Sequence, residues 1–494
     1  MYGDICKRKT WMLVALIMCL GPMVVGAVEH PSHFYVNNPG YSTPAMSEPA
    51  ASGGTATQIV PTSAINTYVP QDDLAARVAE LESQLGKINT KAAADKKKQA
   101  GAPSVKVGGR IQADWAMFDQ SESNRGIYGD WGDRCEFRRA RIFVKGDAFH
   151  VIDYKFQMDF ADNPSVYTGS NQSTSFKDVY ITLKELPLLG HVRIGHYKEP
   201  FGLDQLTSAK YITFMERSLC DENTIVPGRN TGIMVFDHSE NERLTWAIGA
   251  FKSVMGAEPP IRKNEYEGGT ALTMRGTILP WYDEGSGGRG LVHIGGAYSY
   301  RDLDDDEIRL KMTPESHLGE TILDTGNIAA DYWQIAGGEL AFVYGPFSIQ
   351  SECFGGWVHP EGGGSDIQFN GCYVYVSYFL TGEHRRYKLS NGVFDRIKPH
   401  ENFFRVRDEN GYVQMGKGAW EIAYRYSTLD LMDGPVANRG GLARDHTLGL
   451  NWYLNPYTRV MWNYVNSNIP YSDDTGNPAG GTVNVFEMRA QIDF

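Results

Sequence analysis

The last nine residues of the chain, 486–494, alternate apolar and polar side chains without interruption. Successive side chains of a β-strand point to opposite faces. One face of this segment therefore carries Phe486, Met488 and Phe494, and the other carries Glu487 and Arg489. A soluble edge strand can show the same pattern, but a chain that ends on such a strand favours a barrel that closes on itself. In a bilayer, only helices and closed barrels satisfy every backbone polar group, so the segment predicts a transmembrane β-barrel.

The amino-terminal segment has the three parts of a secretory signal peptide in order. The basic residues Lys7, Arg8 and Lys9 precede an apolar run over 11–20, and small residues up to Ala27 follow it. The run is too short for a convincing transmembrane helix, and no later segment contains a long apolar stretch. We therefore expect residues 1–27 to be a signal peptide and the mature chain to enter the membrane as strands.

Composition agrees with one large β-domain. Hydrophobic residues make up 42% of the chain and the mean hydropathy is −0.36, values that exclude a helical membrane protein. The 54 glycines and the 12% of aromatic residues suit the turns and the aromatic girdles of a membrane barrel. The formal net charge is −12, but loops and lumen can differ in sign, so this total does not fix the charge inside a pore.

Two segments lie between the signal peptide and the strands. Residues 28–70 are rich in Pro, Ser, Thr, Ala and Gly without a period, which is typical of a flexible linker. Apolar residues then recur at the spacing of a coiled-coil seam and predict a helix over 71–98. They are Leu74, Val78, Leu81, Leu85 and Ile88. Two interpretations remain open: a periplasmic stalk of a homotrimer, or a single amphipathic helix with no partner.

The remainder of the chain reads as one strand after another. Ile152 and Tyr154, for example, alternate with Asp153 and Lys155. About sixteen such segments occur, with lengths that suit tilted membrane strands. They lie near 105–118, 134–148, 151–161, 174–186, 190–198, 228–237, 243–254, 269–279, 290–301, 331–344, 346–358, 369–381, 418–430, 443–454, 457–467 and 482–494. The sequence thus predicts an all-β fold, a sixteen-stranded antiparallel transmembrane β-barrel over 105–494 behind a short N-terminal coiled-coil helix.

The connections between these segments alternate in length. Tight ones occur at 149–150, 187–190, 345–346 and 455–456, and long polar ones at 119–133, 199–227, 302–330 and 468–481. Short turns on one side and long loops on the other are typical of an outer-membrane barrel. The segment 382–417 is long but falls on the short-turn side. Either the strand count is wrong there or this link folds into the barrel.

If the apolar positions face lipid, the opposite positions face the lumen and carry more basic than acidic residues. The basic ones are Lys106, Arg110, Arg139, Arg141, Lys145, Lys155, Lys184, Arg193, Arg243, Arg275, Arg301, Arg425, Arg459 and Arg489. The acidic ones are Asp114, Asp153, Asp159, Asp178, Glu339, Glu352, Glu421, Glu487 and Asp493. Rings of Arg and Lys make anion pores, and a low-dielectric wall focuses their field. The alternative is that each Arg pairs with an acid across neighbouring strands.

The long link 199–227 is a candidate constriction. It follows Lys198 and contains Lys210 and Arg217, and Arg229 follows it. It also contains apolar residues that a wholly exposed loop would not need, namely Tyr211, Ile212, Phe214 and Met215. We expect the loop to pack against the inner wall, where it would bury these side chains and narrow the pore.

Four cysteines follow the signal peptide: Cys135, Cys220, Cys353 and Cys372. An oxidising compartment allows them to pair. Cys353 and Cys372 can face each other across one hairpin, and the alternative is that all four are unpaired residues of the wall or loops.

No catalytic constellation is present in the sequence. His196, His293 and His446 stand singly within predicted strands, without the spacing of a metal-binding or nucleophile motif. We therefore predict no enzyme activity, no catalytic residue, no metal site and no cofactor.

Several short motifs in this region resemble the phosphate-selective porin O/P family. They lie at 137–141, 198–202, 214–217, 228–232, 380–383 and 418–421, in the family's order, within a resemblance that runs from about 105 to 494. The resemblance implies a homotrimer of sixteen-stranded barrels with the third external loop folded inward. In well-known members an arginine ladder and central lysines pass phosphate or polyphosphate.

By these motifs Arg138, Arg139, Lys198 and Arg217 would be the nearest counterparts of the basic track, although a full lysine cluster at the constriction is not matched. With Arg141, Lys210 and Arg229 they form the predicted anion-binding set. We predict a channel of the cell outer membrane for passive diffusion of small anions, with phosphate or polyphosphate as candidates. The alternatives are a general non-selective porin and a structural barrel that anchors the outer membrane to the cell wall. Expected partners are membrane lipid, lipopolysaccharide, small anions and further copies of the chain, but not nucleic acid.

Overall fold

The computed structural model describes residues 102–494 except 162–174, 221–223, 253–268, 304–306, 408–409, 434–440 and 472–477, together with 80, 83–84 and 87. The predicted signal peptide 1–27, the linker 28–70 and most of the predicted helix 71–98 lie outside the described residues. The described positions of that helix are helical and exposed. Within the described part of the chain, no helix combines the length and the apolar character needed to cross a membrane.

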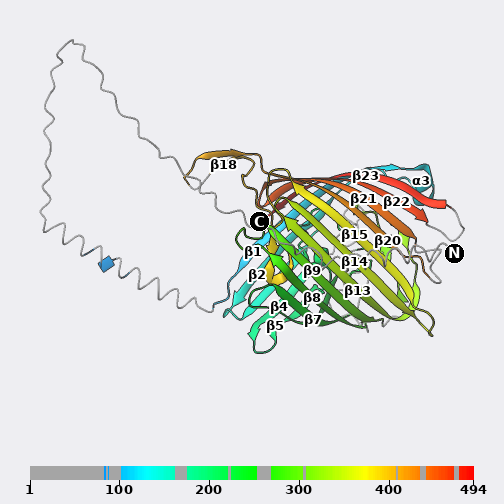
Figure 1. The fold of residues 1–494 in the computed structure, drawn as a ribbon, viewed down its shortest axis with the longest axis horizontal. Coiled ribbons are helices and arrows are strands. Elements are labelled where there is room, and N and C mark those ends of the chain that lie inside the picture. Colours follow the sequence, from blue (N-terminus) through cyan, green and yellow to red (C-terminus); the bar gives the residue numbers. More distant parts are fainter. Residues whose placement is uncertain are drawn as a thin grey trace, which may run out of the picture. The chain divides into compact units, whose positions relative to one another are not determined.

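Sixteen antiparallel strands form a closed barrel (Figure 1), which confirms the predicted fold class. They are β1 (Lys106–Gln120), β2 (Arg134–Ala148), β3 (Ile152–Asp159), β4 (Ser175–Leu186), β5 (Gly190–Lys198), β6 (Arg229–His238), β7 (Leu244–Lys252), β8 (Thr270–Tyr282), β9 (Gly290–Asp302), β13 (Ile328–Tyr344), β14 (Phe347–Pro360), β15 (Ile367–Phe379), β20 (Ala419–Asp430), β21 (Leu442–Asn455), β22 (Thr458–Tyr471) and β23 (Pro478–Asp493). Each strand pairs with its neighbour in the chain, and β1 pairs with β23 to close the sheet, from Arg110 opposite Asp493 to Gln120 opposite Val483. Closure leaves no unpaired sheet edge, as a bilayer requires.

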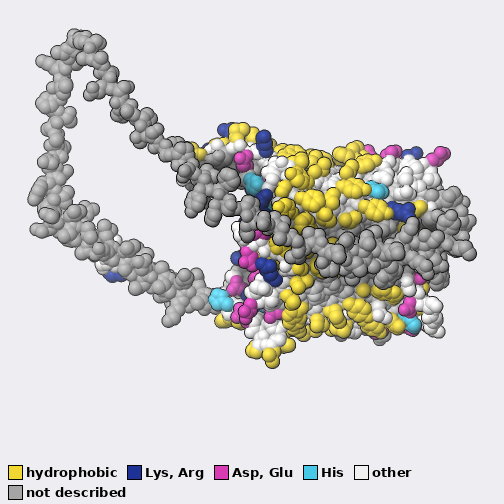
Figure 2. Space-filling model, viewed as in Figure 1, with side chains coloured by type: hydrophobic (Ala, Val, Ile, Leu, Met, Phe, Trp, Pro, Cys, Tyr) yellow, Lys and Arg dark blue, Asp and Glu magenta, His cyan; other side chains and the backbone are white. Residues whose placement is uncertain are grey.

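The alternation seen in the sequence separates the outer face of the wall from the inner face. In β8, Leu272 and Ile278 are exposed, whereas Thr273 and Arg275 are buried inside the barrel. Figure 2 shows hydrophobic side chains gathered in a band over the outer face, with charged side chains toward the two ends of the barrel. Such a band is the surface that lipid covers.

Aromatic residues stack in rows near both ends of the strands. At the short-turn end, the Trp420 and Trp452 rings lie 5.0 Å apart on neighbouring strands. At the other end, the Tyr332 ring lies 5.4 Å from Tyr300 and 4.6 Å from His359. These rows correspond to the aromatic girdles at the two interfaces of a membrane barrel.

Long loops fill one half of the lumen. Loop 199–228 holds the short helix α4 (Leu203–Leu206), and loop 303–327 holds β10 (Glu307–Ile308), β11 (Lys311–Met312) and β12 (Leu323–Asp324). Both pack into the part of the barrel bounded by β13–β15 and β20–β23. Their buried apolar residues form one core with Trp131, which follows α3 (Glu122–Tyr128), and with the strand residue Trp333. Ile212, Phe214 and Met215 are buried, as expected, and Tyr211 is half-buried.

The first part of the segment 382–417, residues 382–397, enters the barrel and is named the inward segment, so the strand count was right and the link folds inward. It contains β16 (Tyr387–Lys388), η2 (Leu389–Asn391) and β17 (Val393–Phe394), followed by the hairpin β18 (Phe404–Arg407) and β19 (Val413–Gly416). Phe394 packs with Leu203 of the long loop and with Leu291 of the wall. The Tyr387 hydroxyl is 2.6 Å from Nδ1 of His293 in β9. The hairpin extends away from the barrel at the short-turn end (Figure 1).

The structure resolves the open question about cysteine pairing. Cys353 of β14 lies directly opposite Cys372 of β15, and the two form a disulfide with their Cα atoms 4.1 Å apart. Cys135 is exposed and Cys220 is buried.

Candidate functional site

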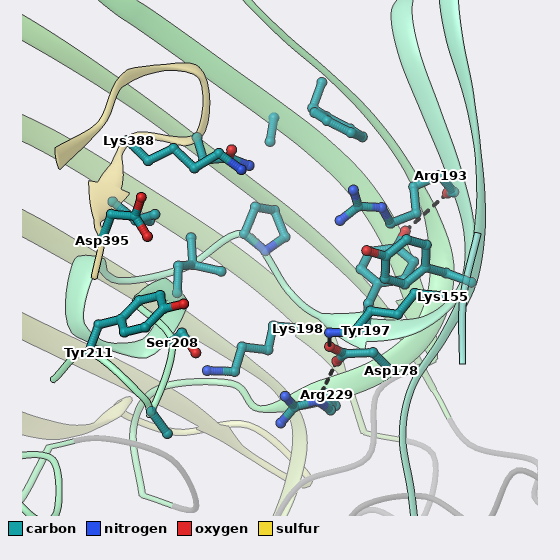
Figure 3. A pocket seen from close by; sticks show the side chains of 18 of the residues that line it. Lys155, Asp178, Arg193, Tyr197, Lys198, Ser208, Tyr211, Arg229, Lys388 and Asp395 are labelled. Atoms are coloured by element: carbon teal, nitrogen blue, oxygen red, sulfur yellow. Dashed lines mark hydrogen bonds and ion pairs between the residues drawn. The ribbon is translucent and has the colours of Figure 1, made fainter. Parts of the chain in front are cut away.

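The half of the lumen that the loops leave open contains a cavity of about 560 Å³. It is bounded by the inner faces of β1–β8, by loop 199–228 and by residues 388–395 of the inward segment. Figure 3 shows Lys388 and Asp395 across the cavity from Arg193 and Lys155. Twelve of the lining residues are basic: Arg110, Arg139, Arg141, Lys145, Lys155, Arg193, Lys198, Lys210, Arg217, Arg229, Arg275 and Lys388. Three are acidic: Asp178, Asp237 and Asp395.

Glu199 anchors the first residue of the loop that borders this cavity. Its carboxylate accepts hydrogen bonds from Nδ2 of Asn230 at 2.6 Å and Oγ1 of Thr273 at 2.5 Å, and it forms an ion pair with Arg301 at 2.8 Å. All four side chains are buried, and the three partners belong to β6, β8 and β9. These contacts fix the position of Glu199 at the end of β5, where loop 199–228 begins.

Glu352, on the opposite wall, binds the next turn of the loop. Gly202 has φ 74°, a backbone conformation that glycine adopts without strain. The chain then presents the backbone N–H groups of Leu203 and Asp204 to the Glu352 carboxylate at 2.6 and 2.9 Å. These are the first N–H groups of α4, which have no partner within the helix. The turn therefore crosses the lumen and is held at both walls.

The side chain of Arg217 stabilises the loop by binding the loop's backbone. Its guanidinium donates hydrogen bonds to the carbonyl oxygens of Asp204 at 2.9 Å, Gln205 at 3.2 Å and Thr207 at 3.1 Å. Because these donors are bound to carbonyls, the main role of Arg217 is to stabilise the loop. Its positive charge still adds to the field in the cavity.

A β-bulge places Arg138 next to the same loop. The register of β1 and β2 shifts between Gln112 and Ala113, so Arg138 is the extra residue and both it and Arg139 turn inward. Arg138 donates two hydrogen bonds of 2.9 and 3.1 Å to the Glu216 carboxylate. Arg489 contacts the same carboxylate at 2.6 Å. Burial raises the pKa of Glu216, but the charges of Arg138 and Arg489 outweigh burial and hold this pKa well below its usual value.

Most lumenal charges outside the cavity are paired, as the alternative interpretation required. Arg425 contacts Glu315 at 2.6 Å and Arg489 contacts Asp114 at 2.6 Å. At the cavity itself the acids are shared: Asp178 contacts both Lys155 and Arg229. Arg141 and Arg275 of the cavity are paired as well, with Asp159 and Glu339, so the basic excess at the cavity rests on the lining residues that have no such partner.

Four basic side chains of the cavity have no acidic group within ion-pair distance among the described residues: Arg110, Lys145, Arg193 and Lys388. Arg110 is only 7% exposed, and its Nη1 has no hydrogen-bond partner in the described part of the chain. Arg193 stacks on Tyr180, with its guanidinium carbon 4.2 Å from the ring centroid, and on Phe236 at 4.9 Å. These contacts fix the direction in which Arg193 points.

Six of the seven predicted site residues line the cavity: Arg139, Arg141, Lys198, Lys210, Arg217 and Arg229. Arg138 does not, because it is turned to Glu216. Arg110, Lys145, Lys155, Arg193 and Arg275 also line it but were absent from the predicted set. Strand alternation had placed these five in the lumen, whereas the predicted set was drawn from the family motifs and from the link 199–227. No strand alternation could have placed Lys388 in the lumen, because it lies on the inward segment and not on a wall strand.

The family model described as phosphate-selective porin O and P matches residues 105–494. The chain belongs to the phosphate-selective porin O and P family. Porin O of Pseudomonas aeruginosa is 28% identical over 397 residues, which cover 73% of this chain and 82% of the relative. An uncharacterised protein of Caulobacter vibrioides is 26% identical over 415 residues, covering 80% of this chain and 75% of that protein.

Solved structures of outer-membrane proteins are similar to this porin at low identity. The channel DcaP of Acinetobacter baumannii has a TM-score of 0.45 and 13% identity, covering 79% of this chain and 97% of that one. A loop L8 deletion mutant of OmpT of Vibrio cholerae has a TM-score of 0.48 and 12% identity, covering 80% and 100%.

Family membership, the closed barrel and the apolar outer band make this porin a channel of the outer membrane rather than an enzyme. No group of three or more His, Cys, Asp or Glu among the described residues is arranged to hold a metal ion.

Proposed function

We propose that this porin passes small anions by passive diffusion and that phosphate is among them. The observation that carries the proposal is the cavity, whose lining has twelve basic and three acidic residues. Basic rings produce anion selectivity in pores, and the low-dielectric wall focuses their field into the space a solute would cross. The description of the family as phosphate-selective supports phosphate as one of the solutes.

The chemistry of the lining suits phosphate oxygens. Arg110 and Arg193 present planar forks of donors that match an oxyanion, whereas Lys145 and Lys388 act as point charges. The unsatisfied Nη1 of Arg110 would gain an acceptor from a passing anion. Transit requires that no single site hold the solute too tightly, and basic residues contributed by six strands, the loop and the inward segment offer several moderate sites.

The test is the reversal potential of single channels in a planar bilayer with a KCl gradient. We expect the wild type to prefer chloride, and the double variant Lys145→Glu, Lys388→Glu to shift the potential toward potassium. Lys311→Glu changes a lysine on loop 303–327 whose side chain is 51% exposed, and it should leave the potential nearly unchanged. High salt should weaken the shift, since the Debye length is ~3 Å at 1 M.

A wild-type channel that already prefers potassium would overturn the anion proposal and leave a general porin. Membrane lipid and lipopolysaccharide are the partners that we propose for the apolar outer band. A barrel that carries no current at all would instead favour the structural role of a membrane anchor.

A further inference from the structure

We infer, on the basis of the proposed function, that the cavity selects organic anions that carry an apolar ring or chain beside the charged group. The lining is amphipathic rather than uniformly basic. Arg110, Lys145 and Lys155 lie on β1–β3, whereas β6 contributes Met234 and Phe236 to the same cavity. Inorganic phosphate can use the first group of side chains but gains nothing from the second.

The apolar part of the lining belongs to the strand wall. Met234 and Phe236 are at inward-facing positions of β6, because their neighbour Ile233 is exposed on the outer face. Met234 is buried in a cluster with Tyr197 and Phe251, and Phe236 packs against that cluster. Inward positions of a water-filled porin are normally polar, so side chains of this kind beside a basic cavity point to a solute with an apolar body.

Arg193 joins the two parts of the lining. One of its faces covers Tyr180, and its guanidinium also lies against Phe236, whose ring stacks on His191 at 5.2 Å. Its Nε donates to Thr182 at 3.0 Å, and it has no acidic partner among the described residues. A carboxylate or phosphate bound to Arg193 would therefore hold an attached ring against Phe236.

The size of the cavity agrees with such a solute. Its volume of about 560 Å³ lies within the roughly 300–1,000 Å³ of sites that bind small organic molecules. Across the cavity, Val393 adds apolar surface from the inward segment. The site thus offers apolar contacts on more than one side of a solute whose charge is held by the basic residues.

The experiment compares how three anions block the chloride current of wild-type channels: inorganic phosphate, methyl phosphate and phenyl phosphate. We expect phenyl phosphate to half-block at a concentration roughly tenfold below that of methyl phosphate, the effect of burying part of a ring. Phenyltrimethylammonium has the same ring with a positive charge, and it should not block.

The variant Phe236→Ser should abolish the difference between phenyl and methyl phosphate. Phe236→Leu keeps an apolar side chain and should keep most of the preference. If Phe236→Ser does not insert, Met234→Gln provides the same test.

Equal block by phenyl and methyl phosphate in an anion-preferring wild type would overturn this inference and leave the proposed function intact. Block by phenyltrimethylammonium would overturn it as well, because the ring alone would then suffice. A cation-preferring wild type would instead overturn the proposed function.

Discussion

At the scale of single residues, the basic side chains of the lumen divide according to what their donors contact. Arg217 donates to three backbone carbonyls and Arg138 grips Glu216. Lys145 and Lys388 have no acidic partner among the described residues and face the cavity. The sign of the charge is the same in all four, but only the last two are free to respond to a solute.

The role of Arg217 as a brace can be separated from its charge. Arg217→Lys keeps the positive charge but cannot reach three carbonyls with one ammonium, and hydrogen bonds to charged groups contribute about 1.5–3 kcal/mol each. We expect a lower thermal unfolding midpoint and noisier single-channel current, with nearly unchanged ion preference. If stability and noise match the wild type while selectivity falls, Arg217 acts on the solute instead.

Glu216 provides a prediction about pH. Because its pKa in the folded protein is well below the ordinary value of 4.5, its ionised form stabilises the fold fully above about pH 4.5. This stabilisation is lost as the pH falls through the lowered pKa. The difference in unfolding midpoint between wild type and Glu216→Gln should therefore be constant from pH 7 to 5 and shrink below pH 4.5. A difference that already changes between pH 7 and 5 would contradict it.

At the scale of elements, the pore is shaped by two inward segments that meet. Arg396 on the inward segment forms an ion pair with Asp493 of β23, and its Nη2 donates to the hydroxyl of Tyr211 at 3.1 Å. Phe394 of the same segment, on which Arg385 stacks at 3.5 Å, packs with Leu203 of loop 199–228. Loop 199–228 and segment 382–417 thus support each other, although they enter from opposite ends of the barrel.

Removing the link between these segments should widen the channel. Arg396→Gln loses the ion pair with Asp493, so we expect a larger unitary conductance with more frequent sublevels in planar bilayers. Arg386→Gln is the matched control, because Arg386 lies on the same segment and no side-chain ion pair holds it among the described residues. Equal conductance in the two variants would show that Arg396 does not hold the constriction.

At the scale of the whole molecule, the assembly of copies remains a proposal. We propose a homotrimer that the predicted seam over 71–98 helps to join. Leu81→Asp with Leu85→Asp puts charge into the seam and should reduce cross-linked trimers of the intact protein. Ser83→Asp with Gln84→Asp adds the same charge at exposed positions and should not. Cross-linking that yields only monomers of the wild type would exclude the stalk.

The barrel was predictable because its pattern is imposed on every strand. Lipid outside and a polar lumen inside require alternation, so all sixteen strands were located before their pairing was known. The site was less accessible to such reasoning. The bulge at Arg138 depends on the register between two strands, and the contacts of Arg217 depend on the path of a loop. Lys388 reaches the cavity through a segment whose direction no local pattern specifies.

The hairpin formed by β18 and β19 has a practical consequence for mapping topology. It extends beyond the barrel at the short-turn end, the end that outer-membrane barrels keep in the periplasm. An epitope inserted beside Asn410 should therefore escape antibodies added to intact cells and become reachable only after the outer membrane is permeabilised. An epitope beside Glu320, in the long loop at the opposite end, should be labelled on the intact cell. The pair would report the orientation of the inserted barrel directly, without any measurement of current.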